Sequence, residues 1–205
     1  LGVMYSSGQG VSADDAAAFN WLLKAAEQGH AQAQHLTALR YASGRGVTQN
    51  DTQAVHWYQQ AAEQGVADAQ YNLGFMYGAG RGVAQNDEKA YQWYSKVAEL
   101  GDAEAQFNLG VRYESGRGTK QDDVLAVAWY RKAAEQNHQR ALAHLGYMYE
   151  KGLNGKERNW VFAADNYKKA YDLGESNAGM SFVLLKKDTT ESIEMLKDMA
   201  AKGNL

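Results

Sequence analysis

Apolar side chains recur along most of this chain at the spacing of one helix face. In the segment 69–77, Ala69, Leu73 and Tyr77 stand at positions i, i+4 and i+8, so they share one side of a helix. Gly80 and Gly82 follow, and glycine accepts the left-handed backbone with which helices commonly end. The pattern therefore predicts a first helix that stops at a glycine loop.

A second apolar stripe begins after this loop. Asp87 stands where a helix N-cap or first-turn acid belongs, and Gly101 closes the segment. Between them, apolar residues share one helix face: Ala90, Trp93, Tyr94, Val97 and Ala98. The segment 87–101 therefore predicts a second helix, which completes a helix–turn–helix unit.

The same unit recurs every 36 residues. Its repeating columns are Tyr5, Tyr41, Tyr77, Tyr113 and Tyr149; Gly8, Gly44, Gly80, Gly116 and Gly152; Gly10, Gly46, Gly82 and Gly118; and Trp21, Trp57, Trp93 and Trp129. Small residues such as the pair Ala61–Ala62 allow close approach of helices, while Trp and Tyr are expected to fill the space between layers. One helix pair cannot bury such aromatic residues alone, so we predict an all-α solenoid of stacked units.

The repeats are expected to form a single array over residues 1–205. Their predicted bounds are roughly 1–32, 33–68, 69–104, 105–140 and 141–177, followed by a degenerate C-terminal capping repeat over 178–205. In the capping repeat, 181–185 and 191–201 are predicted to be helical. Leu1 falls inside the repeating pattern, so we expect natural sequence upstream of it.

A few positions depart from the repeat. Thr37 and Ala38 replace Leu and Gly in the second repeat, and we expect the fold to tolerate them because neither adds charge. In the fifth repeat, Asn154 replaces the second loop glycine and Asn166 replaces the Trp.

The repeating motif is specific enough to suggest a family. Ala-x-Ala-Gln-x-x-Leu-Gly-x-x-Tyr-x-x-Gly-x-Gly, then Asp, then Ala-x-x-Trp-Tyr-x-x-Ala-Ala-Glu-x-Gly, resembles the Sel1-like repeat, a relative of the tetratricopeptide repeat. The resemblance covers roughly residues 1–180 and looks bacterial. It implies a right-handed α/α superhelix of about five to six repeats, and an adaptor in signalling, secretion, envelope regulation or host interaction.

Composition removes several classes of function. The 21 basic and 24 acidic residues are mixed, and a net charge of −3 offers no field that would attract nucleic acid. The chain has no cysteine, which excludes disulfides and thiolate metal sites and separates it from the cysteine-rich branch of the family. We find no apolar run long enough for a membrane span and predict no cofactor.

The first helices carry a second set of residues opposite Leu73 and Tyr77. These residues form an apolar and aromatic ladder with a polar rim, which we expect to line a concave groove that binds a protein or peptide partner. The candidates are His35, Leu39, Tyr71, Asn72, Phe75, Phe107, Asn108, Val111, His144 and Tyr147, with Ala143 in the same columns. The alternative is that they pack against the second helix or the next repeat.

Other charged and titratable residues have simpler interpretations. Arg45, Arg81 and Arg117 could form a basic stripe for acidic groups, or could be solvated loop residues. The histidine pairs His30 with His35 and His138 with His144 lack the i, i+4 spacing of a helical metal site, so no metal is predicted. The acidic pairs Asp14–Asp15 and Asp122–Asp123 fall at helix starts, where they complement the helix dipole.

The sequence therefore favours a non-enzymatic interaction scaffold or adaptor. A structural spacer or self-associating segment is the main alternative, and a hydrolase is a more distant one, because no nucleophile, base and orienting group converge. The compartment stays open, although the family resemblance favours the periplasm or secretion over the cytoplasm.

Overall fold

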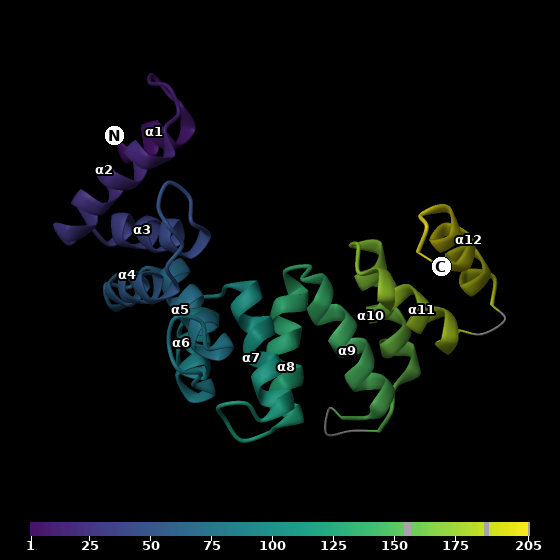
Figure 1. Ribbon diagram of the computed structural model, residues 1–205. Helices are drawn as coiled ribbons and strands as arrows, with labels where there is room; N and C mark the ends of the chain where they lie inside the picture. The colour runs from purple at the N-terminus through teal and green to yellow at the C-terminus, as the bar shows by residue number, and fades with distance from the viewer. Residues whose placement is uncertain (154–156, 187–188, 205) are drawn as a thin grey trace. The chain divides into compact units, whose positions relative to one another are not determined.

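The computed structural model describes residues 1–153, 157–186 and 189–204 (Figure 1). Within these residues the chain is helical, with loops and no strand, so the all-α prediction is confirmed. The helices are α1 (Gly2–Ser7), α2 (Asp15–Glu27), α3 (Ala31–Ser43), α4 (Asp51–Glu63), α5 (Ala67–Ala79), α6 (Asp87–Glu99), α7 (Ala103–Ser115), α8 (Asp123–Glu135), α9 (Gln139–Lys151), α10 (Trp160–Asp172), α11 (Ser176–Leu185) and α12 (Thr190–Ala201).

Odd-numbered helices are the first helices of the repeats, and even-numbered helices are the second. Helices α3 to α10 all have 13 residues, which is the regularity that the 36-residue period requires. The helices α11 and α12 confirm the two short helices predicted near the C-terminal end.

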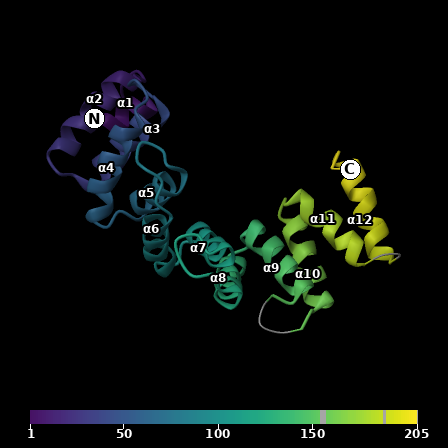
Figure 2. The same ribbon diagram turned by 60° about the horizontal axis from the view of Figure 1, so that its bottom comes forward.

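The chain divides into two compact units, Leu1–Val97 and Ala98–Leu205, and the boundary falls in the last turn of α6. In the first unit, consecutive helices from α1 through α5 pack against one another. In the second unit, the same holds from α7 to α12. Figures 1 and 2 both show α7 beside α8 and α9 beside α10.

Local sequence sets where the helices begin and end. The N-cap side chains of Asp14, Asn50, Asp122 and Asn159 each accept a hydrogen bond from the backbone N–H three residues later. Helices α3, α5, α7 and α9 each end at a glycine in the left-handed conformation. Asp15 and Asp123 occupy the first turns of their helices, as the sequence predicted.

In the second to fifth repeats, the core is built on a buried tyrosine of the second helix. Tyr130 and Tyr167 are buried, and their rings lie against Gly110 and Gly146 of the first helices. A Cβ at either glycine would lie 2.6 Å from the ring, so the two columns depend on each other.

The tryptophan column lies nearer the surface than the sequence predicted. Trp21 is 42% exposed, and Trp57, Trp93 and Trp129 are only half-buried. A lysine three residues later covers the rings of Trp93 and Trp129, with its ammonium 4.1 and 3.8 Å from the ring centre. Tyrosine is therefore the residue that fills the space between layers, and the expectation for Trp21 was wrong.

The structure tolerates the departures from the repeat that it describes. Thr37 and Ala38 are completely buried in α3, although no described group bonds the Thr37 hydroxyl. Asn166 is half-buried and donates to the carbonyl of Phe162 at 2.8 Å. Asn154 lies outside the described residues.

Candidate functional site

The predicted ladder consists of two columns with different exposure. The column that holds His35, Tyr71, Phe107 and Ala143 is buried or half-buried, and His35 and Phe107 are each only 5% exposed. These two residues are therefore interior residues, and their expected exposure was wrong. The alternative of packing against neighbouring helices describes this column.

The second column is exposed. Leu39, Phe75 and Tyr147 have 38%, 45% and 42% of their surface exposed, and Val111 is half-buried. Val3 of the first repeat stands in the same column and is 59% exposed. We call Val3, Leu39, Phe75, Val111 and Tyr147 the exposed column. Repeated exposure of large apolar side chains at one position is the feature on which a binding surface can be built.

In the first unit, the buried column packs against tyrosines of the second helices. The His35 ring packs 6.0 Å from the Tyr58 ring, and the Asn72 amide donates to His35 Nε2 at 3.4 Å. Tyr71 makes an edge contact with Tyr94 at 5.4 Å between ring centres. Burial lowers the pKa of His35, so this ring is held as a neutral packing group.

In the second unit, Phe107 is the centre of an aromatic cluster. Its ring stacks on His138 at 4.8 Å, and His144 meets it edge-on at 5.3 Å. His138 Nε2 lies 2.8 Å from a Glu104 oxygen, and Arg140 pairs with the same carboxylate. Asn108 donates to the carbonyl of Glu104 at 2.9 Å. Phe107 thus joins α7 to α9, whereas the Asn108 hydrogen bond lies within α7. Among the candidates of α9, His144 and Tyr147 reach the surface.

A cavity of about 410 Å³ opens beside His144 and Tyr147. Its walls come from α7, α9, α10 and the start of α11, and they include Glu114, Tyr167 and Glu175. Glu114 Oε2 accepts hydrogen bonds from the Tyr130 hydroxyl at 2.5 Å and from His144 Nδ1 at 3.1 Å. The hydrogen bond from His144 is the main cause that lowers the pKa of Glu114, so its carboxylate is ionised at neutral pH.

A second cavity, of about 520 Å³, lies among α8, α9 and α10. Its walls carry the cations Arg131 and Lys169 and the anions Glu135 and Asp172. These charges cancel, and none of the predicted site residues lines it. The smaller cavity is therefore the one that coincides with the predicted groove.

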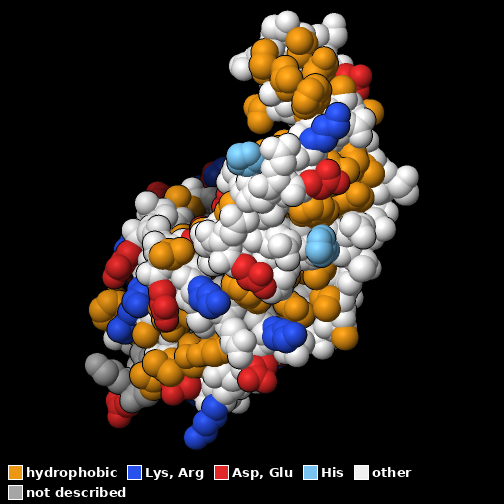
Figure 3. Space-filling model, turned by 90° about the vertical axis from the view of Figure 1, so that its left-hand side faces the viewer, with side chains coloured by type: hydrophobic (Ala, Val, Ile, Leu, Met, Phe, Trp, Pro, Cys, Tyr) orange, Lys and Arg blue, Asp and Glu red, His pale blue; other side chains and the backbone are white. Residues whose placement is uncertain are grey.

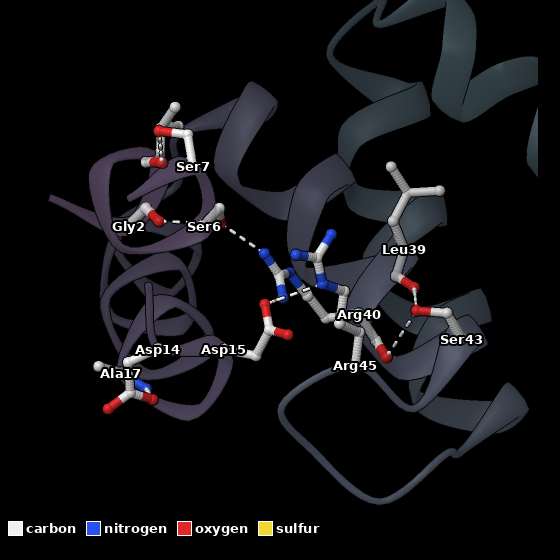
Figure 4. Close-up of polar contacts among 11 residues, drawn as sticks. Gly2, Ser6, Ser7, Asp14, Asp15, Ala17, Leu39, Arg40, Ser43 and Arg45 are labelled. Atoms are coloured by element: carbon white, nitrogen blue, oxygen red, sulfur yellow. Dashed lines mark hydrogen bonds and ion pairs between the residues drawn. The ribbon is translucent and has the colours of Figure 1, made fainter. Parts of the chain in front are cut away.

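The loop arginines do not form a free basic stripe in the first unit. Arg81 makes two hydrogen bonds to the Asp51 carboxylate, at 2.7 and 3.1 Å, and Arg45 pairs with Asp15 at 2.8 Å. Figure 4 shows that the side chains of Arg40 and Arg45 both reach the Asp15 carboxylate. Arg40 also donates a hydrogen bond to the Ser6 hydroxyl of α1. Arg45 and Arg81 thus each form an ion pair that joins one repeat to the start of the second helix in the preceding repeat. We call these ion pairs the clamps.

Sequence reasoning missed these clamps, although a signal for them was present. Asp15 precedes Arg45 by 30 residues, and Asp51 precedes Arg81 by the same distance. In a solenoid, two residue types that recur at a constant sequence separation shorter than the repeat period indicate a contact between neighbouring repeats. The aspartates therefore stand in the first turns of helices and also join repeats.

A third cavity, of about 350 Å³, lies in the first unit beside Val3 and Leu39 of the exposed column. Acidic and basic side chains are interspersed on the face in Figure 3, which agrees with the small net charge. No cluster of three or more metal-binding side chains is present in residues 1–153, 157–186 and 189–204. Among the same residues, no helix has the length and apolar character needed to cross a bilayer.

Comparison with known proteins agrees with the fold. A model described as the Sel1 repeat matches residues 1–30, 31–66, 67–102, 103–138 and 139–175. Four of these matches begin at or beside the first residue of a first helix: α3, α5, α7 and α9. A search of curated proteins found no match.

Two solved structures are similar over nearly the whole chain. A Sel1 repeat protein from Oxalobacter formigenes is 34% identical, with a TM-score of 0.82, and the match covers 96% of this chain and 81% of that one. A protective antigen present in uropathogenic Escherichia coli strains, which displays an SLR fold, is 33% identical with a TM-score of 0.66. That match covers 99% of this chain and 52% of the antigen, so this chain spans about half of its length. By its repeats and by this similarity, the chain belongs to the Sel1 repeat family.

Proposed function

We propose that this chain is a non-catalytic interaction scaffold that binds segments of a partner protein through the exposed column of its first helices, with anchors in each of its two units. The observation that carries the proposal is the exposure of Leu39, Phe75 and Tyr147 at equivalent repeat positions. Exposed apolar side chains that recur in register give a partner several anchoring points, and large apolar contacts dominate binding energy at interfaces. Protein interaction is typical of this fold.

The chemistry of the first helices supports a passive role. Two carboxylates of α7, Glu104 and Glu114, are engaged by histidine, arginine and tyrosine side chains. These contacts lower the pKa of both carboxylates, away from the values that general acid–base catalysis at neutral pH needs. A hydrolase is therefore the weaker alternative.

We also propose where the interaction takes place. The similar protein from uropathogenic Escherichia coli is described as a protective antigen. This description supports a role for the present chain at the bacterial envelope or in contact with a host.

Selection of peptides from a random displayed library tests the binding role. We expect enrichment of peptides with large apolar residues, and at least about tenfold weaker binding by the Leu39→Ser, Phe75→Ser, Tyr147→Ser triple variant, because each lost anchor costs about 1 kcal/mol or more. Val124→Ser is a matched control, since Val124 is 56% exposed but lies on α8. Equal loss in the control would contradict the proposal.

Light scattering distinguishes the proposed scaffold from the main alternative, a structural spacer or a self-associating segment. A structural spacer shows no binding and a mass that does not depend on concentration. A self-associating segment shows a mass that rises with concentration, and the triple variant abolishes this rise. The proposed scaffold binds the selected peptides as a species of constant mass.

A further inference from the structure

The cavity of about 410 Å³ in the second unit is lined by charged side chains, whereas the exposed column beside it is apolar. Two carboxylates, Glu114 of α7 and Glu175 at the start of α11, contribute to its walls, and no Lys or Arg does; His144 also lines it and bonds Glu114. The remaining walls include the rings of Tyr147 and Tyr167 and the hydroxyl of Ser181. The cavity is therefore an anionic hollow with aromatic sides, next to an exposed apolar anchor.

Both carboxylates keep free acceptor capacity. Glu114 receives both of its hydrogen bonds on Oε2, and no described group donates to Oε1. Glu175 occupies the N-cap position of α11, but its side chain accepts no capping hydrogen bond and pairs with no described cation. A charged group with an open lone pair in a partly enclosed site is stabilised when a cation binds it.

The tyrosine beside the cavity is suited to hold a cation on its ring. The ammonium of Lys151 already lies 5.7 Å from the centre of the Tyr147 ring, while it pairs with Glu150 at 2.8 Å. A planar guanidinium combines this ring contact with two parallel hydrogen bonds to a carboxylate, which an ammonium cannot do. The volume lies within the range of about 300–1,000 Å³ that is typical of pockets for small groups.

We propose that this cavity receives an arginine side chain of the partner segment, with its guanidinium between Glu114 and Glu175 and against Tyr147. This inference rests on the proposed function, because the arginine belongs to the segment that follows the exposed column. It goes further by giving the partner a chemical requirement: an arginine next to a large apolar residue.

Two peptide libraries test this requirement directly. Both are heptapeptides with blocked ends and random flanking positions, and they differ only in the central residue, which is arginine in one and citrulline in the other. Citrulline keeps the shape of arginine but has no charge. We expect the chain to retain the arginine library about tenfold more strongly, because hydrogen bonds between charged groups are worth about 1.5–3 kcal/mol.

Three variants show where the arginine binds. Glu175→Gln and the Glu114→Gln, Glu175→Gln double variant should reduce the preference for arginine. Glu175→Gln removes no hydrogen bond between described groups, so it tests the site even where the double variant folds poorly. Glu135→Gln removes the same charge from the cavity of about 520 Å³ in this unit and should leave the preference unchanged.

The outcomes separate this inference from the proposed function. Equal retention of both libraries, or a preference that survives Glu175→Gln, overturns the arginine site. If retention then still depends on Leu39, Phe75 and Tyr147, the proposed function stands without the arginine site. If neither library binds, both proposals are wrong.

Discussion

At the residue scale, the most informative contacts are the ion pairs between repeats. Arg81 reaches Asp51 with two hydrogen bonds, which is the geometry in which arginine binds a carboxylate best. Asp51 also occupies the first turn of α4, where a negative charge is favourable. One aspartate therefore stabilises both a helix and a junction between repeats.

We expect a double-mutant cycle to detect this junction. Asp51→Asn and Arg81→Met should each lower stability, and their coupling energy at pH 7 should be about 1 kcal/mol, since both side chains are partly exposed. The measurement is urea unfolding of the four proteins. Strictly additive effects would show that the pair contributes nothing.

The pH dependence of the same cycle has a definite sign. The Arg81 guanidinium holds the pKa of the Asp51 carboxyl below its ordinary value of 3.8. The folded pKa is lower than the unfolded one, so this stabilisation is present above pH 3.8 and is lost as pH falls through the folded value. The coupling should therefore be constant from pH 5 to 7 and disappear in stronger acid.

At the element scale, the glycine loops determine how closely repeats approach. Gly82 has a φ of +67°, and a Cβ on it would lie 2.2 Å from the carbonyl oxygen of Asp51. The second loop glycine is thus required by the backbone of the preceding repeat as well as by its own conformation. Gly46 shows the same approach to the carbonyl of Asp15, at 2.0 Å.

A pair of alanine substitutions separates these two requirements. Gly65 has a φ of +87°, and no atom lies within 4 Å of the place that a Cβ would occupy, so Gly65→Ala should cost only the backbone penalty of about 1 kcal/mol. Gly82→Ala should cost about 3 kcal/mol or more, because the backbone of α4 must also move. Thermal or urea unfolding compares them, and equal losses would contradict the close-approach argument.

The helices themselves were predictable from sequence, because period and glycine position determine where they begin and end. The repeat at 69–101 shows this, since α5 covers the predicted segment 69–77 and α6 begins at the predicted Asp87 and ends two residues before Gly101. The depth of each side chain was not predictable in the same way. Phe107 and Tyr147 stand in the two ladder columns, yet Phe107 is buried under His138 and Arg140 while Tyr147 is 42% exposed. Contacts from neighbouring helices decide exposure, and a helical wheel does not contain them.

At the scale of the whole molecule, the repeat produces regular sites from regular packing. The buried columns use tyrosine, glycine and alanine to join helices, and the exposed column is left for binding. The two compact units each hold part of this column: Val3, Leu39 and Phe75 in the first, and Val111 and Tyr147 in the second. Each unit therefore has its own apolar anchors, and the second adds the anionic cavity.

The central claim is that partner segments bind through the exposed column of the first helices. Photo-cross-linking with benzoylphenylalanine tests it most directly, with the probe placed at position 75 or 147, and at position 124 or 161 as controls. Val124 and Val161 are 56% and 75% exposed on second helices, so accessibility alone does not favour the first pair. We predict that peptides selected from the random library form adducts from positions 75 and 147 and not from positions 124 and 161. Adducts from only the second-helix positions would contradict the account, because they would place the binding surface on the second helices.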